Sequence, residues 1–102
     1  MTKRSETFLS LVHSDPANPL FRFSLGQCLL QEGKAQDALI HLEKAVAAKA
    51  DWMMPKILLG KCYLALGQKE PARVVLQEAL QCAVNQGHED PEAELRVLLS
   101  QL

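Results

Sequence analysis

The sequence lacks the features of a membrane-spanning chain and of a disulfide-linked one. Lys56 and Lys61 interrupt its most apolar stretch, which therefore falls short of the ~18 apolar residues that a membrane span needs. Its three cysteines are odd in number and form no CxxC pair, which fits a reducing compartment. The first residues, Met1 to Glu6, lead into a short apolar patch without a small-residue cleavage site and do not resemble a secretory signal. We expect a cytoplasmic protein with no membrane partner.

Neither sign of charge is in excess. Lys+Arg 11 against Asp+Glu 12 gives a formal net charge of −1, which does not predict a nucleic-acid-binding surface. The sequence also has no strand-like alternation of apolar and polar residues, no low-complexity segment and no long linker. At 102 residues, with 48% hydrophobic and 23% charged residues, it has the size and composition of one globular domain.

What the sequence does contain is an internal repeat. When it is shifted along itself by thirty-four residues, eight positions match between residues 25–45 and their copy. A fixed period of this size is typical of an array built from one helical unit. The matching pairs are Leu25 and Leu59, Gly26 and Gly60, Cys28 and Cys62, Leu30 and Leu64, Gly33 and Gly67, Ala38 and Ala72, Leu42 and Leu76, and Ala45 and Ala79.

Apolar periodicity and end signals predict six helices. Three residues are expected to cap helices. Asn18, followed by Pro19, caps the helix that starts at about residue 19, Asp51 the one that starts at about residue 52, and Asp90 the last. Gly33, Gly67 and Gly87 are expected to end three of the helices, because glycine adopts the left-handed C-cap conformation at little cost. The expected spans are 3–13, about 19–32, 35–49, 52–66 and 70–85, and 90 to the terminus.

The repeated residues, LGxCxLxxGxxxxAxxxLxxA, resemble the tetratricopeptide repeat. The resemblance implies an all-α fold, an antiparallel array of helical hairpins (an α-α superhelix). It divides a single domain, 1–102, into an N-terminal half-repeat helix (3–13), two repeats (19–52 and 53–86) and a C-terminal capping helix (90–102). Tyr63 stands where the family favours a large aromatic residue, and Leu29 takes that place in the first copy.

Two features of the repeat concern packing. Gly26 and Gly60 are expected to face Ala38 and Ala72 and so to let paired helices approach closely, while Leu42 and Leu76 fill the space before the next hairpin. Arg22 and Lys56 stand where the family often has tryptophan or another large apolar residue. The residues expected to compensate for them are Phe21, Phe23, Trp52 and Met53.

The sequence offers no convincing catalytic or metal-binding group. Cys28 can be paired with His41 as nucleophile and base, but Cys28 and Cys62 recur at one position of the repeat, where a buried cysteine acts as a small hydrophobe. The acidic residues after His88 surround a helix N-terminus, where the helix dipole favours negative charge. We expect no enzyme activity, no cofactor and no metal.

In the tetratricopeptide family, partners are commonly held by the first helix of each hairpin, whose exposed face lines a concave groove. The matching positions predict apolar anchors at Phe23, Leu30, Ile57 and Leu64, with Gln27 and Lys61 as polar orienters. The whole predicted groove comprises Leu20, Phe23, Gln27, Leu30, Met54, Ile57, Lys61, Leu64, Leu95 and Leu98. Phe23 and Gln27 occupy two places where grooves that bind a C-terminal carboxylate carry basic or amide residues.

This apolar face allows three arrangements, since large apolar patches usually mark contact sites. It holds an amphipathic helix or extended apolar peptide, it is buried in a homodimer, or the last helix leans into it so that Leu95 and Leu98 are core. The predicted function is a non-catalytic protein-interaction module that binds a protein or peptide. The alternatives are a homo-oligomeric scaffold and, more narrowly than the first, a small secretion chaperone.

Overall fold

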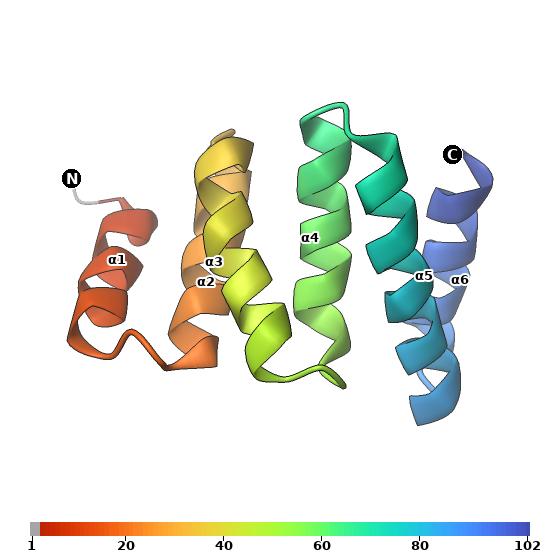
Figure 1. Ribbon diagram of the computed structural model, residues 1–102, viewed down its shortest axis with the longest axis horizontal. Coiled ribbons are helices and arrows are strands. Elements are labelled where there is room, and N and C mark those ends of the chain that lie inside the picture. The colour runs from red at the N-terminus through yellow and green to blue at the C-terminus, as the bar shows by residue number, and fades with distance from the viewer. Residues whose placement is uncertain (1–2) are drawn as a thin grey trace.

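The computed structural model describes residues 3–102, which form six helices in a row (Figure 1). Each helix begins and ends within two residues of its expected limits, and these residues contain no strand, so the predicted all-α hairpin array is confirmed. The helices are α1 (Arg4–Ser14), α2 (Pro19–Gln31), α3 (Ala35–Ala48), α4 (Met53–Ala65), α5 (Lys69–Gln86) and α6 (Glu89–Ser100).

Sequence-local signals set several of the helix ends. Gly33, Gly67 and Gly87 have φ of 79°, 74° and 71°, and each chain reversal is closed by a backbone bond such as Lys34 N–H to Leu29 O at 2.8 Å. At the start of α2, the Asn18 side-chain oxygen accepts from the N–H groups of Leu20 and Phe21, at 3.0 and 3.2 Å.

Two predicted caps are wrong. α4 begins after Trp52 and α6 after His88, and neither of these residues caps its helix through its side chain. Asp51 lies one residue before the capping position of α4, and Asp90 lies inside the first turn of α6. Both carboxylates are therefore one or two positions away from the place where a cap must stand.

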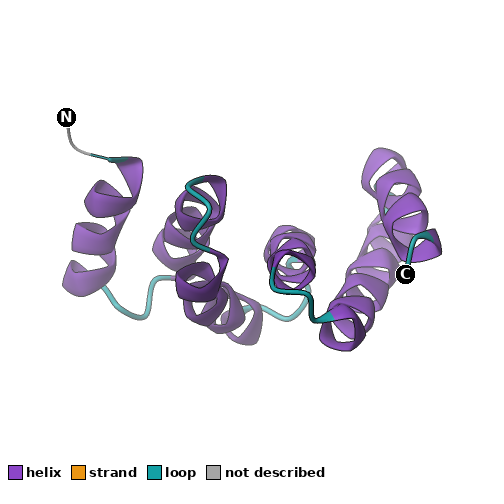
Figure 2. Cartoon of the chain, turned by 90° about the horizontal axis from the view of Figure 1, so that it is seen from above, coloured by secondary structure: helices purple, strands orange, loops and turns teal. Residues whose placement is uncertain are grey.

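Each helix packs mainly on the helices next to it in the chain, and α2 also touches α4 (Figures 1 and 2). The array measures 38 × 27 × 21 Å, with the first and last helices at its two ends. No helix within residues 3–102 is both long enough and apolar enough to cross a membrane.

Inside each hairpin, the side chain nearest to the glycine is a leucine. A Cβ placed on Gly26 would stand 2.6 Å from Cγ of Leu42, and a Cβ on Gly60 would overlap the side chain of Leu76. Leu42 and Leu76 are fully buried. Each leucine therefore occupies the space between the two helices of its own hairpin, and it also belongs to a cluster with residues of the following helices.

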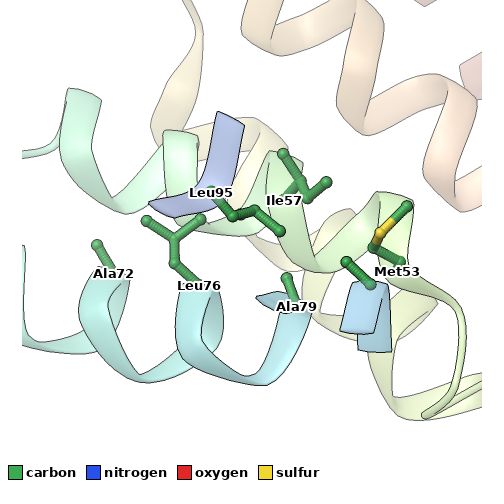
Figure 3. Close-up of a cluster of buried hydrophobic side chains, with 7 residues drawn as sticks. Met53, Ile57, Ala72, Leu76, Ala79 and Leu95 are labelled. Carbon is green, nitrogen blue, oxygen red and sulfur yellow. The ribbon is translucent and has the colours of Figure 1, made fainter. Parts of the chain in front are cut away.

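The last helix completes the core of the C-terminal half. Leu95 of α6 joins Met53 and Ile57 of α4 and a run of small and branched residues of α5 in one buried cluster. Figure 3 shows the Leu95 side chain between those of Leu76 and Ile57. A second cluster, around Ala38, Leu42 and Leu59, joins α3, α4 and α5.

Candidate partner-binding surface

The ten predicted groove residues divide into three groups by exposure: two are exposed, six are partly buried and two are buried. Leu20 and Met54 are exposed, at 60% and 42%, and are the most accessible apolar members. Six others are partly buried, namely Phe23, Gln27, Leu30, Lys61, Leu64 and Leu98. We call Leu20, Phe23, Gln27, Leu30, Met54, Lys61 and Leu64 the α2/α4 surface, since they lie on two helices that touch each other.

Ile57 and Leu95 do not belong to this surface. Their side chains are 4% and 0% exposed, because α6 packs against α4 and α5 and encloses both (Figure 3). Among the three arrangements open from the sequence, the last helix does lean onto the predicted face and fills part of it. Leu98 packs on the edge of the same cluster.

The charge of Lys61 is engaged within the chain. Its Nζ lies 3.0 Å from a carboxylate oxygen of Glu94 on α6, and both side chains are about half exposed. Glu94 stands thirty-four residues after Gly60, where the earlier helices need glycine for a close crossing. At this position of α6 the side chain reaches sideways to α4 instead.

Two hollows adjoin the exposed ends of this surface. One, of about 370 Å³, is lined by Pro19, Leu20, Lys49 and Trp52. The other, of about 580 Å³, is lined by Trp52, Met53, Met54, the end of α5 and His88. Trp52 and Lys49 border both hollows. The exposed apolar side chains of α2 and α4 therefore each stand beside a concave space.

Trp52 is the residue that the sequence did not assign to the surface. Its ring lies 5.0 Å from that of Phe23, centroid to centroid, at 47°, a tilted aromatic contact that ties the start of α4 to α2. As the chain's single tryptophan, placed just before a helix, it was expected only to compensate for Arg22 and Lys56. Its place between two hollows follows from the way α4 sits beside α2.

Arg22 and Lys56 are accommodated by polar contacts. Lys56 is buried along its stem, and its Nζ reaches Glu78 at 3.9 Å and the Cys82 sulfur at 3.8 Å. Arg22 donates to the backbone oxygen of Pro16 at 3.1 Å and lies 2.9 Å from Nδ1 of His41. The long side chains thus fill space with methylenes while their charged ends reach partners.

Both cysteines weighed as nucleophiles are enclosed in the protein. Cys28 and Cys62 are both buried, and the Cys62 thiol donates to the backbone oxygen of Ala35 at 2.9 Å. Burial, with a smaller contribution from Glu43, raises the pKa of the Cys62 thiol, which is opposite to what an activated thiolate needs. His41 contacts Arg22 instead of a thiol, and burial together with the Arg22 and Lys44 charges lowers its pKa. Within residues 3–102 no three His, Cys, Asp or Glu side chains cluster in a way that could hold a metal ion.

Comparisons with known proteins identify the repeat. The family described as regulator of microtubule dynamics protein 1-3 matches residues 15–102. A TPR repeat-containing protein of Pseudomonas aeruginosa is 34% identical over 85 residues, which cover 83% of this chain and 81% of that protein. The chain therefore belongs, like this relative, to the tetratricopeptide-repeat proteins. The resemblance stated from the sequence is therefore confirmed.

Solved structures share the fold. The type III secretion translocator chaperone SycD of Yersinia enterocolitica has a TM-score of 0.90 at 17% identity, covering 95% of this chain and 68% of that one. PcrH, in complex with the chaperone-binding region of PopD, has a TM-score of 0.88 at 21% identity, over 95% and 74%. The first TPR of Spaghetti (RPAP3), bound to an HSP90 peptide, has a TM-score of 0.76 at 18% identity, over 94% and 77%. The tetratricopeptide-repeat chain thus has the fold of these structures, two of which were solved with bound peptide segments.

Proposed function

We propose that this tetratricopeptide-repeat protein is a non-catalytic adaptor that holds an apolar peptide or amphipathic helix along the α2/α4 surface. The observation that carries the proposal is the pair of hollows bordered by Trp52, with Leu20 beside one and Met54 beside the other. Exposed apolar side chains next to concave space are the usual marks of a site for an apolar ligand. A helix-in-groove or extended-peptide mode meets both requirements.

Individual residues take distinct roles in this proposal. Leu20 and Met54 are the accessible anchors, Phe23, Leu30 and Leu64 form the partly buried walls, and Leu98 of α6 borders the surface. Gln27 and Lys61 orient polar groups of the partner, and Lys61 does so by exchanging or sharing its contact with Glu94. Ile57 and Leu95 support the surface from beneath.

The proposal extends to the organisation of the chain. The repeats span 19–52 and 53–86, and the helices over 3–13 and 90–102 flank them as half-repeats of one domain, 1–102. The protein acts in the cytoplasm, without a cofactor.

Proteins of the same fold that are titled as secretion chaperones or solved with peptides support the mode of binding through their shared architecture alone. A secretion chaperone remains a narrower form of the same proposal.

A selection from a displayed peptide library, followed by titration of the selected peptide, tests the proposal. We expect Leu20→Ser and Met54→Ser each to weaken binding by about 10-fold, the effect of losing about 1.4 kcal/mol of apolar contact. Val97→Ser on α6 is the matched control, because Val97 is about as exposed as Leu20 and lies outside the surface. Equal binding by all three variants, with the wild-type affinity, contradicts the proposed site.

The alternative function, a homo-oligomeric scaffold, is separated by mass. Light scattering coupled to size exclusion over a wide concentration range is expected to give a mass near 11.3 kDa throughout. A larger mass that Leu20→Ser or Met54→Ser reduces would mean that the α2/α4 surface binds a second copy of the chain. That result would replace the adaptor with the scaffold.

A further inference from the structure

A third hollow lies outside the α2/α4 surface and shares no residue with it. It occupies about 380 Å³ between α1 and α3, over α2. Leu25 and Leu29 of α2 line it from one helix, and Leu9 of α1 and Ile40 of α3 line it from the two flanking helices. Both flanking side chains are exposed to solvent although they are large and apolar. The hollow is therefore an apolar space that the chain leaves open.

The internal repeat shows what occupies the equivalent space one unit later. Thirty-four residues after Leu29 stands Tyr63, which packs against both core clusters between α3 and α5. Its hydroxyl donates to a carboxylate oxygen of Glu43 on α3, at 3.1 Å. Glu43 in turn stands thirty-four residues after Leu9. In the second interval, between α3 and α5, an aromatic ring of the chain itself therefore stands where the first interval, between α1 and α3, has Leu29.

A second replacement makes the first interval less apolar at its inner wall. Ser5 stands where the next unit has Leu39, which packs against a core cluster. The buried Ser5 hydroxyl donates to Glu32 at 2.9 Å, and Glu32 also lies 3.8 Å from the Lys34 ammonium. These polar groups are satisfied by one another, so they do not require an additional partner.

The rim of the hollow carries uncompensated negative charge. Glu6 on α1 and Asp37 on α3 both line it, and neither forms an ion pair within residues 3–102. Lys34, the cation of the rim, is already paired with Glu32. A basic side chain from outside would therefore meet complementary charge at the mouth of an apolar space.

We propose that this hollow binds an aromatic side chain of a protein partner, presented next to a lysine or arginine. The aromatic ring takes the place that Tyr63 holds in the second interval, with Leu25 and Leu29 beneath it and Leu9 and Ile40 at its sides. The adjacent cation lies against Glu6 and Asp37. This site gives the molecule a second contact surface, independent of the α2/α4 surface.

Capped dipeptides test the proposal on the whole chain by two-dimensional amide NMR. Acetyl-Phe-Lys-amide is expected to cause saturable shifts at Leu9, Leu29 and Ile40, with a dissociation constant on the order of 1 mM, as befits so small a ligand. Acetyl-Ala-Lys-amide, which keeps the charge and lacks the ring, is expected to cause none at the same concentrations. Acetyl-Phe-Glu-amide is expected to bind at least about 3-fold more weakly, because its charge repels the rim.

Two variants and one control complete the test. Leu29→Tyr fills the hollow from within and is expected to abolish the shifts while leaving the melting temperature equal or higher. Ile40→Ser removes one side of the hollow and is expected to weaken binding by about 5-fold or more, whereas Val74→Ser, the same change at the repeat-equivalent position, leaves it unchanged. Ile40 and Val74 are matched in exposure, at 55% and 56%.

Three results would overturn the proposal. The first is unchanged dipeptide binding by Leu29→Tyr. The second is a response to acetyl-Phe-Lys-amide confined to Leu20, Trp52 and Met54, which would place the ring at the α2/α4 surface. The third is a shift of the Leu9 and Ile40 resonances on dilution without dipeptide, which would mean that a second copy covers the hollow.

Discussion

Gly26 and Gly60 each lie in the middle of a helix, where glycine ordinarily weakens the helix by about 1 kcal/mol relative to alanine. Their value comes from the side chain that lies on them. Leu42 and Leu76 have no exposed surface and occupy the space that a Cβ would need. At the residue scale, the spacing between the two helices of a hairpin thus depends on the absence of a Cβ atom at one glycine.

Gly60→Ala is expected to destabilise the protein by roughly 1–2 kcal/mol, because overpacking against Leu76 outweighs the gain in helix propensity. Urea denaturation measures the change. The same substitution in a Leu76→Val background should cost clearly less, since the smaller side chain makes room. A Gly60→Ala protein more stable than wild type would mean that Leu76 moves aside freely.

His41 gives the folded chain a dependence on pH. Burial and the nearby Arg22 and Lys44 charges lower its pKa in the folded state below the ordinary value of 6.5. As pH falls below about 6.5, His41 therefore binds a proton more readily in the unfolded state than in the folded state. The free energy of unfolding decreases as a result. The contact with Arg22 agrees with this, because an imidazolium at Nδ1 would oppose a guanidinium.

The comparison of wild type with His41→Asn isolates this contribution, since His13 and His88 are common to both proteins. Between pH 7.5 and 5.5 the melting temperature of the wild type is expected to fall more than that of the variant. Thermal denaturation followed by circular dichroism provides the measurement. Parallel curves for the two proteins would show that His41 titrates alike in the folded and unfolded chains.

At the scale of elements, α6 changes what the sequence leads one to expect of α4. The helix pattern marks Ile57 and Leu95 as members of a contact surface, whereas α6 buries both of them together with Met53. A side contact adds to this packing, from Lys61 to Glu94, and Arg73 of α5 donates to the backbone oxygen of Leu102 at 2.9 Å. α6 is thus part of the C-terminal core.

Leu95→Ala is therefore expected to destabilise the protein by about 2–5 kcal/mol, the usual cost of a fully buried leucine. Val97→Ala, on the same helix and exposed, is expected to change stability by no more than about 0.5 kcal/mol. Chemical denaturation of both variants separates a core role for Leu95 from a surface role. A small effect of Leu95→Ala, equal to that of Val97→Ala, would return Leu95 to the contact surface.

At the scale of the whole molecule, packing between neighbours along the chain dominates. Each helix packs mainly on its predecessor and successor, and the further contacts, of α2 with α4 and of α6 with α4, join helices two places apart. Arrays of this kind have stabilities close to a sum of local units and their interfaces. A substitution that destabilises one end of the array is then expected to lower the stability of the adjacent helices most.

Hydrogen exchange in Leu95→Ala tests this property. The amides of α4 and α5 are expected to lose more protection than those of α1 and α2, because Leu95 packs directly on the former. Exchange measured by mass spectrometry at peptide resolution is sufficient. A uniform loss over all six helices would instead indicate one fully cooperative unit.

The features that the sequence predicted correctly depend on residues close together in the chain. The Asn18 cap and the left-handed glycines at 33, 67 and 87 each act within one or two turns, and the thirty-four-residue period repeats such local signals along the chain. The six helices and their order follow from them. The two wrong caps, Asp51 and Asp90, are errors of one or two positions, because the capping positions are held by Trp52 and His88, whose side chains form no cap hydrogen bond.

Only the tertiary structure decided which apolar side chains remain exposed. The same helical pattern is present in a face covered by α6, as at Ile57, and in a face open to solvent, as at Leu20 and Met54. The hollow beside Leu29 likewise depends on how far apart α1 and α3 lie. The sequence by itself determined the repeat, the helices and the family. The surfaces were decided by packing, because burial depends on which distant helix comes to lie against each face.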